Sequence, residues 1–281
     1  MSTDTPAPAE KKSRAGRDLP AAIGVAVGLV VVIVASLAFY KALFLIVVAA
    51  AIVAGLWELG RAFSLRGVSM PVALMMAGSL GMLGGSYYGG PEVLVVVLAG
   101  TVMLTVLWRM PRGQAGFVAD VTASTFCLVY APFLASFVAL LLVGDDGVQA
   151  VLTFIAVTAA SDIGGYAVGV LLGRHPMAPA ISPKKSWEGF VGSAISCMGV
   201  GVVCLLFLLD GDWWVGVVLG LIVVVAATLG DLTESLIKRD LGIKDMSNLL
   251  PGHGGIMDRL DSLLATVWVV WLVLHFLLPV A

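Results

Sequence analysis

Charged side chains are scarce in this sequence. Aspartate, glutamate, lysine and arginine make up 12% of its 281 residues, whereas a soluble globular chain carries about a quarter. Hydrophobic residues account for 60%, and the mean hydropathy is +1.05. This composition excludes an ordinary soluble domain and predicts an integral membrane protein. The net charge of −2 indicates nothing about partners, so the positions of the charges must be examined instead.

Cysteine and histidine are also rare, with three residues of each type. Cys127, Cys197 and Cys204 lie inside apolar runs without CxxC spacing, which favours small buried side chains over a redox or metal centre. The histidines are too scattered for a zinc site. The sequence also lacks the GxxxxGK[ST], GxSxG and HExxH motifs, so none of these common catalytic patterns accounts for its function.

Apolar runs long enough to cross a bilayer, which takes about 20 residues, recur along the chain. The fold class predicted from them is an all-α, polytopic membrane protein. The polar residues 1–18 are expected to form a disordered cytoplasmic tail, and the first apolar run lacks a credible cleavage site, which indicates a retained helix. Nine spans are predicted, at about 20–39, 42–60, 69–87, 91–108, 116–142, 148–172, 188–209, 213–233 and 260–279.

Lysine and arginine are distributed unequally over the connections between these spans. If the N-terminus is inside, 15 of the 16 basic residues fall in inner segments, and only Lys41 falls outside. Cytoplasmic connections of membrane proteins carry such an excess of basic residues. The sequence therefore predicts nine spans with a cytoplasmic N-terminus.

Small residues recur at four-residue spacing inside several spans. Such spacing allows the backbones of neighbouring helices to approach closely in lipid. It predicts close helix packing and permits a homodimer. The positions are Gly81 and Gly85, Gly165, Gly169 and Gly173, and Gly216 and Gly220.

Two inner connections, 174–187 and 237–259, are longer than the topology requires. Functional residues concentrate in such loops and in the helix ends beside them. Within a transmembrane domain of residues 19–281, we therefore expect N-terminal helices at 19–147 and a catalytic half at 148–281 that contains both loops.

Acidic residues in or beside apolar spans are energetically costly and indicate function. Asp162 lies within a span, and Asp258 and Asp261 are one turn apart at the start of the last one. Carboxylates close to cations suit Mg²⁺ bound together with substrate phosphates. Four further residues share one helical face at three- and four-residue spacing: Asp231, Glu234, Ser235 and Lys238.

Two other acidic residues permit structural explanations. Glu58 lies one turn before Arg61, which favours an ion pair between them. Asp120 lies near the start of its helix, where a carboxylate suits the helix dipole. For Asp120, the structural and functional interpretations both stay open.

Basic residues and glycines surround the acidic positions. An excess of positive charge beside carboxylates suits a nucleoside triphosphate or an anionic lipid headgroup. Glycines in His253-Gly254-Gly255 free backbone N–H groups for a ligand and lead into a helix N-terminus, which favours phosphate.

In the other loop, Ser182-Pro183 is expected to form a turn, and Trp187-Glu188 to open the next helix. The tryptophan could stack on a base or lie among headgroups.

Three motifs resemble one known family. The segment SLIKRDLGIKDMSNLLPGHGGIMDRLD, Ser235–Asp261, resembles the signature of the bacterial phosphatidate cytidylyltransferases, also called CDP-diacylglycerol synthases. SPKKSWEG resembles the family's SPKKTWEG, with Ser186 in place of threonine, and SDIGGY resembles its Asp-x-x-x-Tyr element. The specific resemblance extends from about Ser161 to Asp261, and the first half matches only in being hydrophobic and multi-spanning.

This resemblance implies an enzyme that transfers CMP from CTP to phosphatidic acid in phospholipid biosynthesis. It implies a requirement for Mg²⁺ and leaves a second, monovalent or divalent cation open. The implied catalytic residues are Asp231, Asp258, Lys238 and Arg239. The implied metal ligands are Asp231, Asp258 and Asp261. The implied substrate-binding residues are Asp162, Ser182, Lys184, Lys185, Trp187, Glu188, Ser235, Lys244, Asp245, His253, Gly254, Gly255 and Arg259.

The expected partners are CTP, phosphatidic acid and the lipid bilayer, with no nucleic acid. The expected location is the plasma membrane, with the active site facing the cytoplasm. Two alternatives stay open. One is a secondary transporter, for which Asp162 would be the best-placed residue. The other is a related enzyme that cytidylylates a different lipid phosphate, such as a polyprenyl phosphate.

Overall fold

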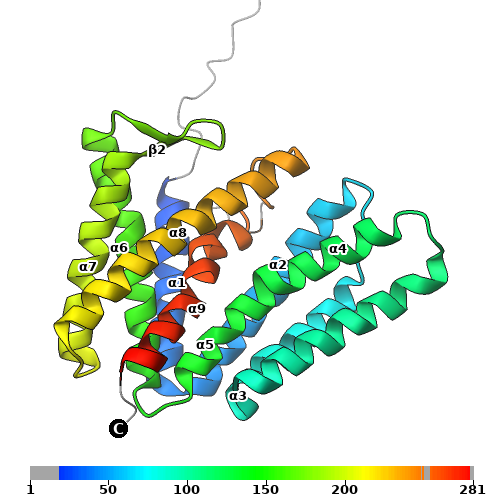
Figure 1. Cartoon of the computed structure of the whole chain (residues 1–281), viewed down its shortest axis with the longest axis horizontal. Helices are drawn as coiled ribbons and strands as arrows, with labels where there is room; N and C mark the ends of the chain where they lie inside the picture. Colours follow the sequence, from blue (N-terminus) through cyan, green and yellow to red (C-terminus); the bar gives the residue numbers. More distant parts are fainter. Residues whose placement is uncertain (1–18, 248, 250–253, 279–281) are drawn as a thin grey trace, which may run out of the picture.

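The computed structural model describes residues 19–247, 249 and 254–278, so the predicted tail 1–18 and His253 lie outside the described residues. Within these ranges the chain is almost entirely helical (Figure 1). Seven helices of this part are long and apolar enough to cross a membrane. These features confirm a polytopic, all-α membrane protein. The count of nine spans and the cytoplasmic N-terminus stay predictions.

The N-terminal half contains a helix that folds back on itself. In α3, Gly90 has a φ of +76° and is followed by Pro91, which breaks the helical path. A Cβ atom at Gly85 would lie 2.9 Å from Val93 Cγ1, so the arms before and after Gly90 pack side by side. These arms correspond to the predicted spans 69–87 and 91–108. The elements of this half are α1 (Leu19–Phe39), α2 (Lys41–Ser64), α3 (Val72–Arg109), η1 (Met110–Arg112), α4 (Phe117–Leu128), η2 (Val129–Phe133) and α5 (Leu134–Leu142).

The helices α4 and α5 form one span, Phe117–Leu142, with a π-helical turn between them. Pro132 lies in this turn and has no backbone N–H to donate, which accounts for the local widening of the helix. The predicted span 116–142 is therefore one continuous element. It separates α3 from α9, and α5 contacts both.

The C-terminal half packs its four long helices in chain order, α6 against α7, α7 against α8 and α8 against α9. A short antiparallel hairpin, β1–β2, lies at one end of α6 and α7 (Figure 1). The elements are α6 (Gly147–Leu172), β1 (Pro176–Ala178), β2 (Ser182–Ser186), α7 (Trp187–Leu208), α8 (Trp213–Leu241) and α9 (Met257–Leu277).

The hairpin and the helix ends correct two sequence expectations. Ser182-Pro183 begins β2 instead of forming a turn, and the turn lies just before it at residues 179–181. The connection expected at 237–259 is shorter, because α8 continues to Leu241 and α9 begins at Met257. Trp187 does open α7, as the sequence predicted.

Glycines bring the backbones of α6, α7 and α8 together, which confirms the predicted close packing. A Cβ atom at Gly189 of α7 would lie 3.0 Å from the Gly165 carbonyl oxygen of α6. A Cβ atom at Gly216 of α8 would lie 2.6 Å from the Gly201 carbonyl carbon of α7. Polar side chains add links between helices, since Ser193 Oγ donates to the Ser161 carbonyl oxygen at 2.7 Å.

This packing predicts a large difference between two glycines of adjacent helices. A Cβ atom at Gly220 would lie 2.5 Å from Met198 N of α7, whereas one at Gly199 would meet nothing within 4 Å. Gly220→Ala should destabilise the protein by ~1–3 kcal/mol through overpacking, and Gly199→Ala should be neutral or stabilising because alanine favours the helix. Thermal unfolding in detergent compares the two variants, and equal midpoints would contradict the packing described.

Candidate functional site

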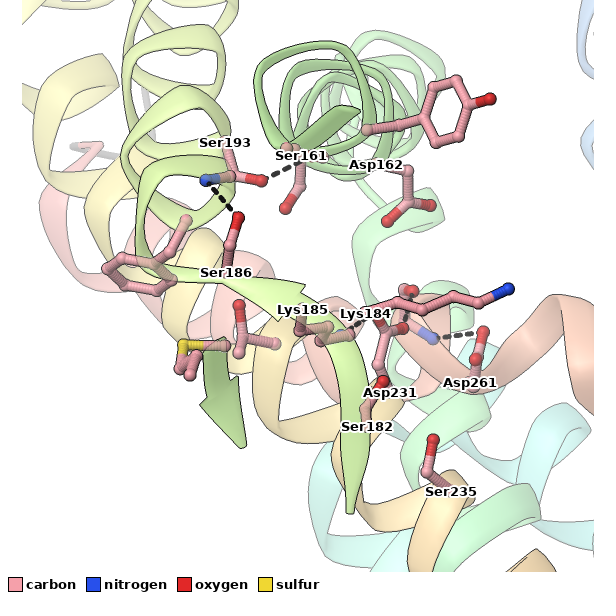
Figure 2. A pocket seen from close by; sticks show the side chains of 18 of the residues that line it. Ser161, Asp162, Ser182, Lys184, Lys185, Ser186, Ser193, Asp231, Ser235 and Asp261 are labelled. Carbon is pink, nitrogen blue, oxygen red and sulfur yellow. Dashed lines mark hydrogen bonds and ion pairs between the residues drawn. The ribbon is translucent and has the colours of Figure 1, made fainter. Parts of the chain in front are cut away.

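A cavity of about 540 Å³ lies where the helices of the C-terminal half end beside the hairpin. Its walls come from the C-terminal parts of α6 and α8, the N-terminal parts of α7 and α9, and the strands β1 and β2 (Figure 2). Segments that are far apart in sequence, from Ser161 to Ser262, thus form one site. Nine of the predicted site residues line the cavity: Asp162, Ser182, Lys184, Lys185, Asp231, Ser235, Asp258, Arg259 and Asp261.

Asp231 connects three elements of the cavity wall. Its Oδ2 atom forms an ion pair with Lys185 Nζ of β2, and its Oδ1 atom accepts a hydrogen bond from Ser262 Oγ of α9 at 2.7 Å. In Figure 2, Asp162 projects from α6 toward Asp231 and Asp261. Carboxylates from three helices therefore face the same space as the lysines of β2.

Lys238 lies between two carboxylates at the base of this arrangement. Its ammonium group is 2.6 Å from Glu234 Oε2 and 2.9 Å from Asp258 Oδ1. The side chains of Lys238, Glu234 and Asp258 are only 17%, 3% and 6% exposed. Lys238 is not among the residues that line the cavity, so its positive charge serves the neighbouring carboxylates. Of the four residues predicted to share one face of α8, Asp231, Glu234 and Ser235 line the cavity, and Lys238 pairs with Glu234 one turn away without lining it.

Asp258 also holds the connection that precedes α9. Its Oδ2 atom accepts the backbone N–H groups of Met246 at 3.0 Å and Gly255 at 2.7 Å. Gly254 has a φ of +83°, and a Cβ atom there would lie 2.8 Å from Asp258 Oδ2. Neither glycine lines the cavity. The Gly254-Gly255 pair was expected to shape a ligand pocket. In the structure, the absence of side chains at these glycines instead lets carboxylate groups of the protein lie against the backbone.

Glu188 and Trp187 lie at the base of the hairpin and outside the cavity lining. The Glu188 carboxylate accepts the backbone N–H groups of Arg174 and His175 at 3.1 and 3.2 Å and contacts His175 Nδ1 at 2.5 Å. It therefore fixes the start of the hairpin to α7. The Trp187 ring is 54% exposed and packs edge to face with Phe190.

Three further predicted residues lie around the end of α8 and do not line the cavity. Arg239 Nη1 donates to the Ala180 carbonyl oxygen at 2.8 Å, which links α8 to the turn of the hairpin. Lys244 and Asp245 are exposed in the connection that follows α8. Lys238 and Arg239 are neighbours in sequence, but they point to different partners because consecutive helical residues occupy different faces.

Glu58 and Asp120, the two acidic residues for which the sequence permitted structural explanations, both have partners within the protein. Asp120 forms a buried ion pair with Arg109 at 2.6 Å and accepts the Ser69 N–H at 2.8 Å, which favours its structural interpretation. The expected Glu58–Arg61 ion pair is wrong. Arg61 instead lies over the Trp57 ring, and Glu58 accepts hydrogen bonds from the start of α9.

Sequence reasoning missed Ser262 and the partners of Glu58. Ser262 is an ordinary serine next to Asp261, and only the packing of α9 on α8 reveals that it holds Asp231. Glu58 bonds backbone N–H groups nearly 200 positions along the chain, for which side-chain spacing gives no signal. The sequence offered only a general clue, which was a carboxylate inside an apolar span.

The donor atoms around the cavity fit a divalent cation. Carboxylate oxygens are the ligands that Mg²⁺ prefers, and Asp162, Asp231 and Asp261 supply them from three helices. Glu234 Oε1 is buried and has no hydrogen-bond partner among the residues described. No preformed cluster of three or more ligating side chains exists in the described part of the chain, so the carboxylates would have to close around an ion together with its other ligands.

Comparison with known proteins covers nearly the whole chain. Residues 20–277 match the cytidylyltransferase family. The chain belongs to this family. A phosphatidate cytidylyltransferase of Mycobacterium bovis is 40% identical over 96% of this chain and 92% of its own length. Its counterpart in Mycobacterium leprae is 39% identical over 94% and 90%, and that of a Synechocystis species is 31% identical over 94% and 97%.

Membership of the cytidylyltransferase family confirms the resemblance seen in Ser235–Asp261. It also corrects the extent of that resemblance, because the match begins at residue 20 and includes the first half of the chain. The one departure within SPKKSWEG has a simple structural consequence. Ser186 caps α7 by accepting the Gly189 N–H at 3.1 Å, a bond that threonine can also form.

The contacts of Lys238 predict a strong effect on stability. Lys238→Met keeps the apolar stem but leaves the buried side chains of Glu234 and Asp258 without their cation, which should cost about 3–5 kcal/mol. Arg239→Met removes an exposed contact to a carbonyl and should cost less than about 1 kcal/mol. Thermal unfolding of both purified variants in the same detergent tests this difference. An equal loss in the two variants would show that Lys238 is not an internal counter-ion.

Proposed function

We propose that this chain transfers CMP from CTP to phosphatidic acid, giving CDP-diacylglycerol and pyrophosphate. The relatives named phosphatidate cytidylyltransferase support the reaction. The observation that carries the proposal is the cavity, which combines the lysines of β2 with carboxylates of α6, α8 and α9 at one end of an apolar bundle. Such a site can receive a lipid phosphate from the bilayer and a nucleotide from the cytoplasm of the cell, at the plasma membrane.

The reaction requires little acid–base chemistry. An oxygen of the lipid phosphate attacks the α-phosphorus of CTP, and the bond from that phosphorus to the β-phosphate oxygen breaks. The nucleophile is already anionic, so no strong base is needed to activate it. Holding the two anions in line and neutralising their charge therefore provide most of the catalysis.

The cations that line the cavity are suited to this charge neutralisation. Lys184 and Lys185 approach from β2, and Arg259 approaches from the first turn of α9. Lys185 is held by Asp231 in the structure, so its position is set before substrate binds. Lys238 acts differently in this proposal. It does not line the cavity, and its ion pairs keep Glu234 and Asp258 in place.

Asp231, Asp261 and Asp162 would hold Mg²⁺, which when bound neutralises phosphate charge and acts as a Lewis acid. Asp258 was expected to be a principal ligand. Its Oδ2 atom already accepts hydrogen bonds from two backbone N–H groups, and its Oδ1 atom accepts one from Lys238 Nζ. It can therefore offer a metal only the remaining lone pair of Oδ1.

Apolar residues complete the cavity beside these charged groups. Tyr166, Met177 and Phe190 line it on α6, β1 and α7. We infer that they contact the glycerol and upper acyl region of the lipid while its tails stay in the bilayer. The grouping of Asp162 with Asp231 and Asp261 in one cavity also disfavours the transporter alternative, in which acidic residues would mark a separate path.

The reaction itself can be tested directly. Purified protein in mixed micelles with labelled CTP, phosphatidic acid and Mg²⁺ should produce labelled CDP-diacylglycerol and an equal amount of pyrophosphate. A polyprenyl phosphate offered in competition should not become labelled. A well-folded preparation that yields no Mg²⁺-dependent product would refute the proposal, and preferential labelling of the polyprenyl phosphate would support the related enzyme instead.

The proposed roles predict different defects for three variants. Asp231→Asn should lower kcat by orders of magnitude, because it removes a metal ligand and the partner of Lys185. Asp258→Asn should lose activity and also stability, since its carboxylate holds the connection before α9. Lys184→Ala should mainly raise KM for one substrate, because a single charge-assisted contact is worth ~1–3 kcal/mol.

Steady-state kinetics and thermal unfolding of the three variants separate these outcomes. Near-normal Mg²⁺-dependent turnover by Asp231→Asn would contradict its role. So would a Lys184→Ala variant as inactive as the aspartate variants, since Lys184 would then be more than a peripheral contact.

A further inference from the structure

We propose that Glu58 of α2 is a positioning residue that holds the first turn of α9, and with it Asp258, Arg259 and Asp261, in the geometry needed at the cavity. Glu58 belongs to the N-terminal half and does not line the cavity. It would act through α9 and not by touching a substrate. The kinetic part of this inference rests on the proposed function.

Glu58 lies in surroundings that would ordinarily exclude a carboxylate. It is 0% exposed, and its neighbours on α2, Leu56 and Leu59, are 1% and 0% exposed. A buried charge is strongly unfavourable unless it is paired or hydrogen-bonded. Among the described residues, no lysine, arginine or histidine forms an ion pair with it. Its hydrogen bonds must therefore account for its presence.

All of the hydrogen bonds described for Glu58 come from the segment that leads into α9. The Oε1 atom accepts Ser247 Oγ at 2.5 Å and the Ile256 N–H at 2.9 Å. The Oε2 atom accepts the Met257 N–H at 2.8 Å. The first N–H groups of a helix lack partners within the helix, and a negative charge there is stabilised by the helix dipole. Glu58 thus caps α9 from another helix.

Helix α2 and the start of α9 pack closely at this contact, with a glycine on each side. A Cβ atom at Gly255 would lie 2.7 Å from Glu58 Oε2, and one at Gly55 would lie 2.7 Å from Met257 Sδ. Glycine on each side therefore allows the carboxylate and the methionine to fit. Met257 is itself 0% exposed. The start of α9 is fixed in position by both packing and hydrogen bonds.

The start of α9, which Glu58 holds, is adjacent to residues that line the cavity. Met257 directly precedes Asp258 and Arg259, and Asp261 is one helical turn further along α9. Asp258 holds the Gly255 N–H at 2.7 Å, so Glu58 and Asp258 together bind the N–H groups of three consecutive residues. A shift of about 1 Å in a reacting geometry can lower a rate by 10²-fold. A residue that prevents such a shift would therefore affect kcat.

Glu58→Gln provides the test, because glutamine keeps the shape but places an NH₂ donor against a backbone N–H. We expect kcat to fall by about 10- to 100-fold, while KM for CTP changes less than about threefold because the contacts from β2, α6 and α8 stay in place. Amide hydrogen exchange in peptides covering residues 255–261 should become faster in the variant, without any substrate present.

Ser247→Ala is a milder variant in the same contact. It removes one of the three donors, and we expect a smaller decrease of kcat in the same direction. Because Ser247 acts on α9 only together with Glu58, the double variant should be no worse than Glu58→Gln alone. Additive losses would show that the two residues act separately, which would overturn the inference.

Asp120→Asn is the matched control for loss of a buried carboxylate. Asp120 is also in the N-terminal half, and the partners described for its carboxylate, Arg109 and Ser69, lie outside α9. This variant should lower the unfolding temperature and leave kcat per folded molecule and exchange at 255–261 unchanged. An equal loss of kcat in Asp120→Asn would mean that Glu58 acts only through general stability.

Two further outcomes also overturn the inference: wild-type kcat in Glu58→Gln, or unchanged exchange in residues 255–261. The second measurement does not depend on catalysis. A wild-type protein that makes no CDP-diacylglycerol would therefore refute the proposed function, while the exchange comparison would still decide whether Glu58 holds the start of α9.

Discussion

The contact of Lys238 with Glu234 and Asp258 fixes where α8 and α9 meet beside the cavity. The lysine and the two largely buried acidic side chains stabilise one another, because each polar group would be costly there without its partners. This contact sets the depth of both helices. It brings Ser262 of α9 to Asp231 of α8, and Asp231 in turn receives Lys185 from the hairpin. The positions of the cavity walls thus follow from one buried cation.

Buried carboxylates serve two purposes in this fold, and their partners distinguish them. Asp120 and Glu58 are held by groups of the protein itself, a buried arginine in one case and backbone N–H groups in the other. Asp162, Asp231 and Asp261 face a shared space from three helices. Acidic residues in apolar spans therefore do not all mark function. What separates the two groups is whether their free lone pairs point into the protein or into a cavity.

The sequence alone predicted the features that depend on periodicity and hydropathy. Apolar runs predict helices because unpaired backbone groups are not tolerated in lipid, and three- and four-residue spacing correctly put Asp231, Glu234 and Ser235 on one face. It failed where partners are distant in sequence. Local spacing paired Glu58 with Arg61, whereas packing of α2 on α9 gave Glu58 a backbone partner. The β1–β2 hairpin was also missed, because its strands have no alternating apolar pattern.

The backbone N–H groups at the start of α9 were expected to bind phosphate, but in the structure they have other partners. A glycine-rich segment before a helix favours phosphate binding by the first backbone N–H groups. Here those N–H groups, from Gly255 to Met257, already donate to Asp258 and Glu58. A phosphate could not use them without displacing two carboxylates. The α7 N-terminus is likewise capped by Ser186. In the proposed function, positive charge for anionic substrates comes from the side chains of Lys184, Lys185 and Arg259, together with Mg²⁺ when it is bound, and Gly254 and Gly255 make room for the protein's own carboxylates.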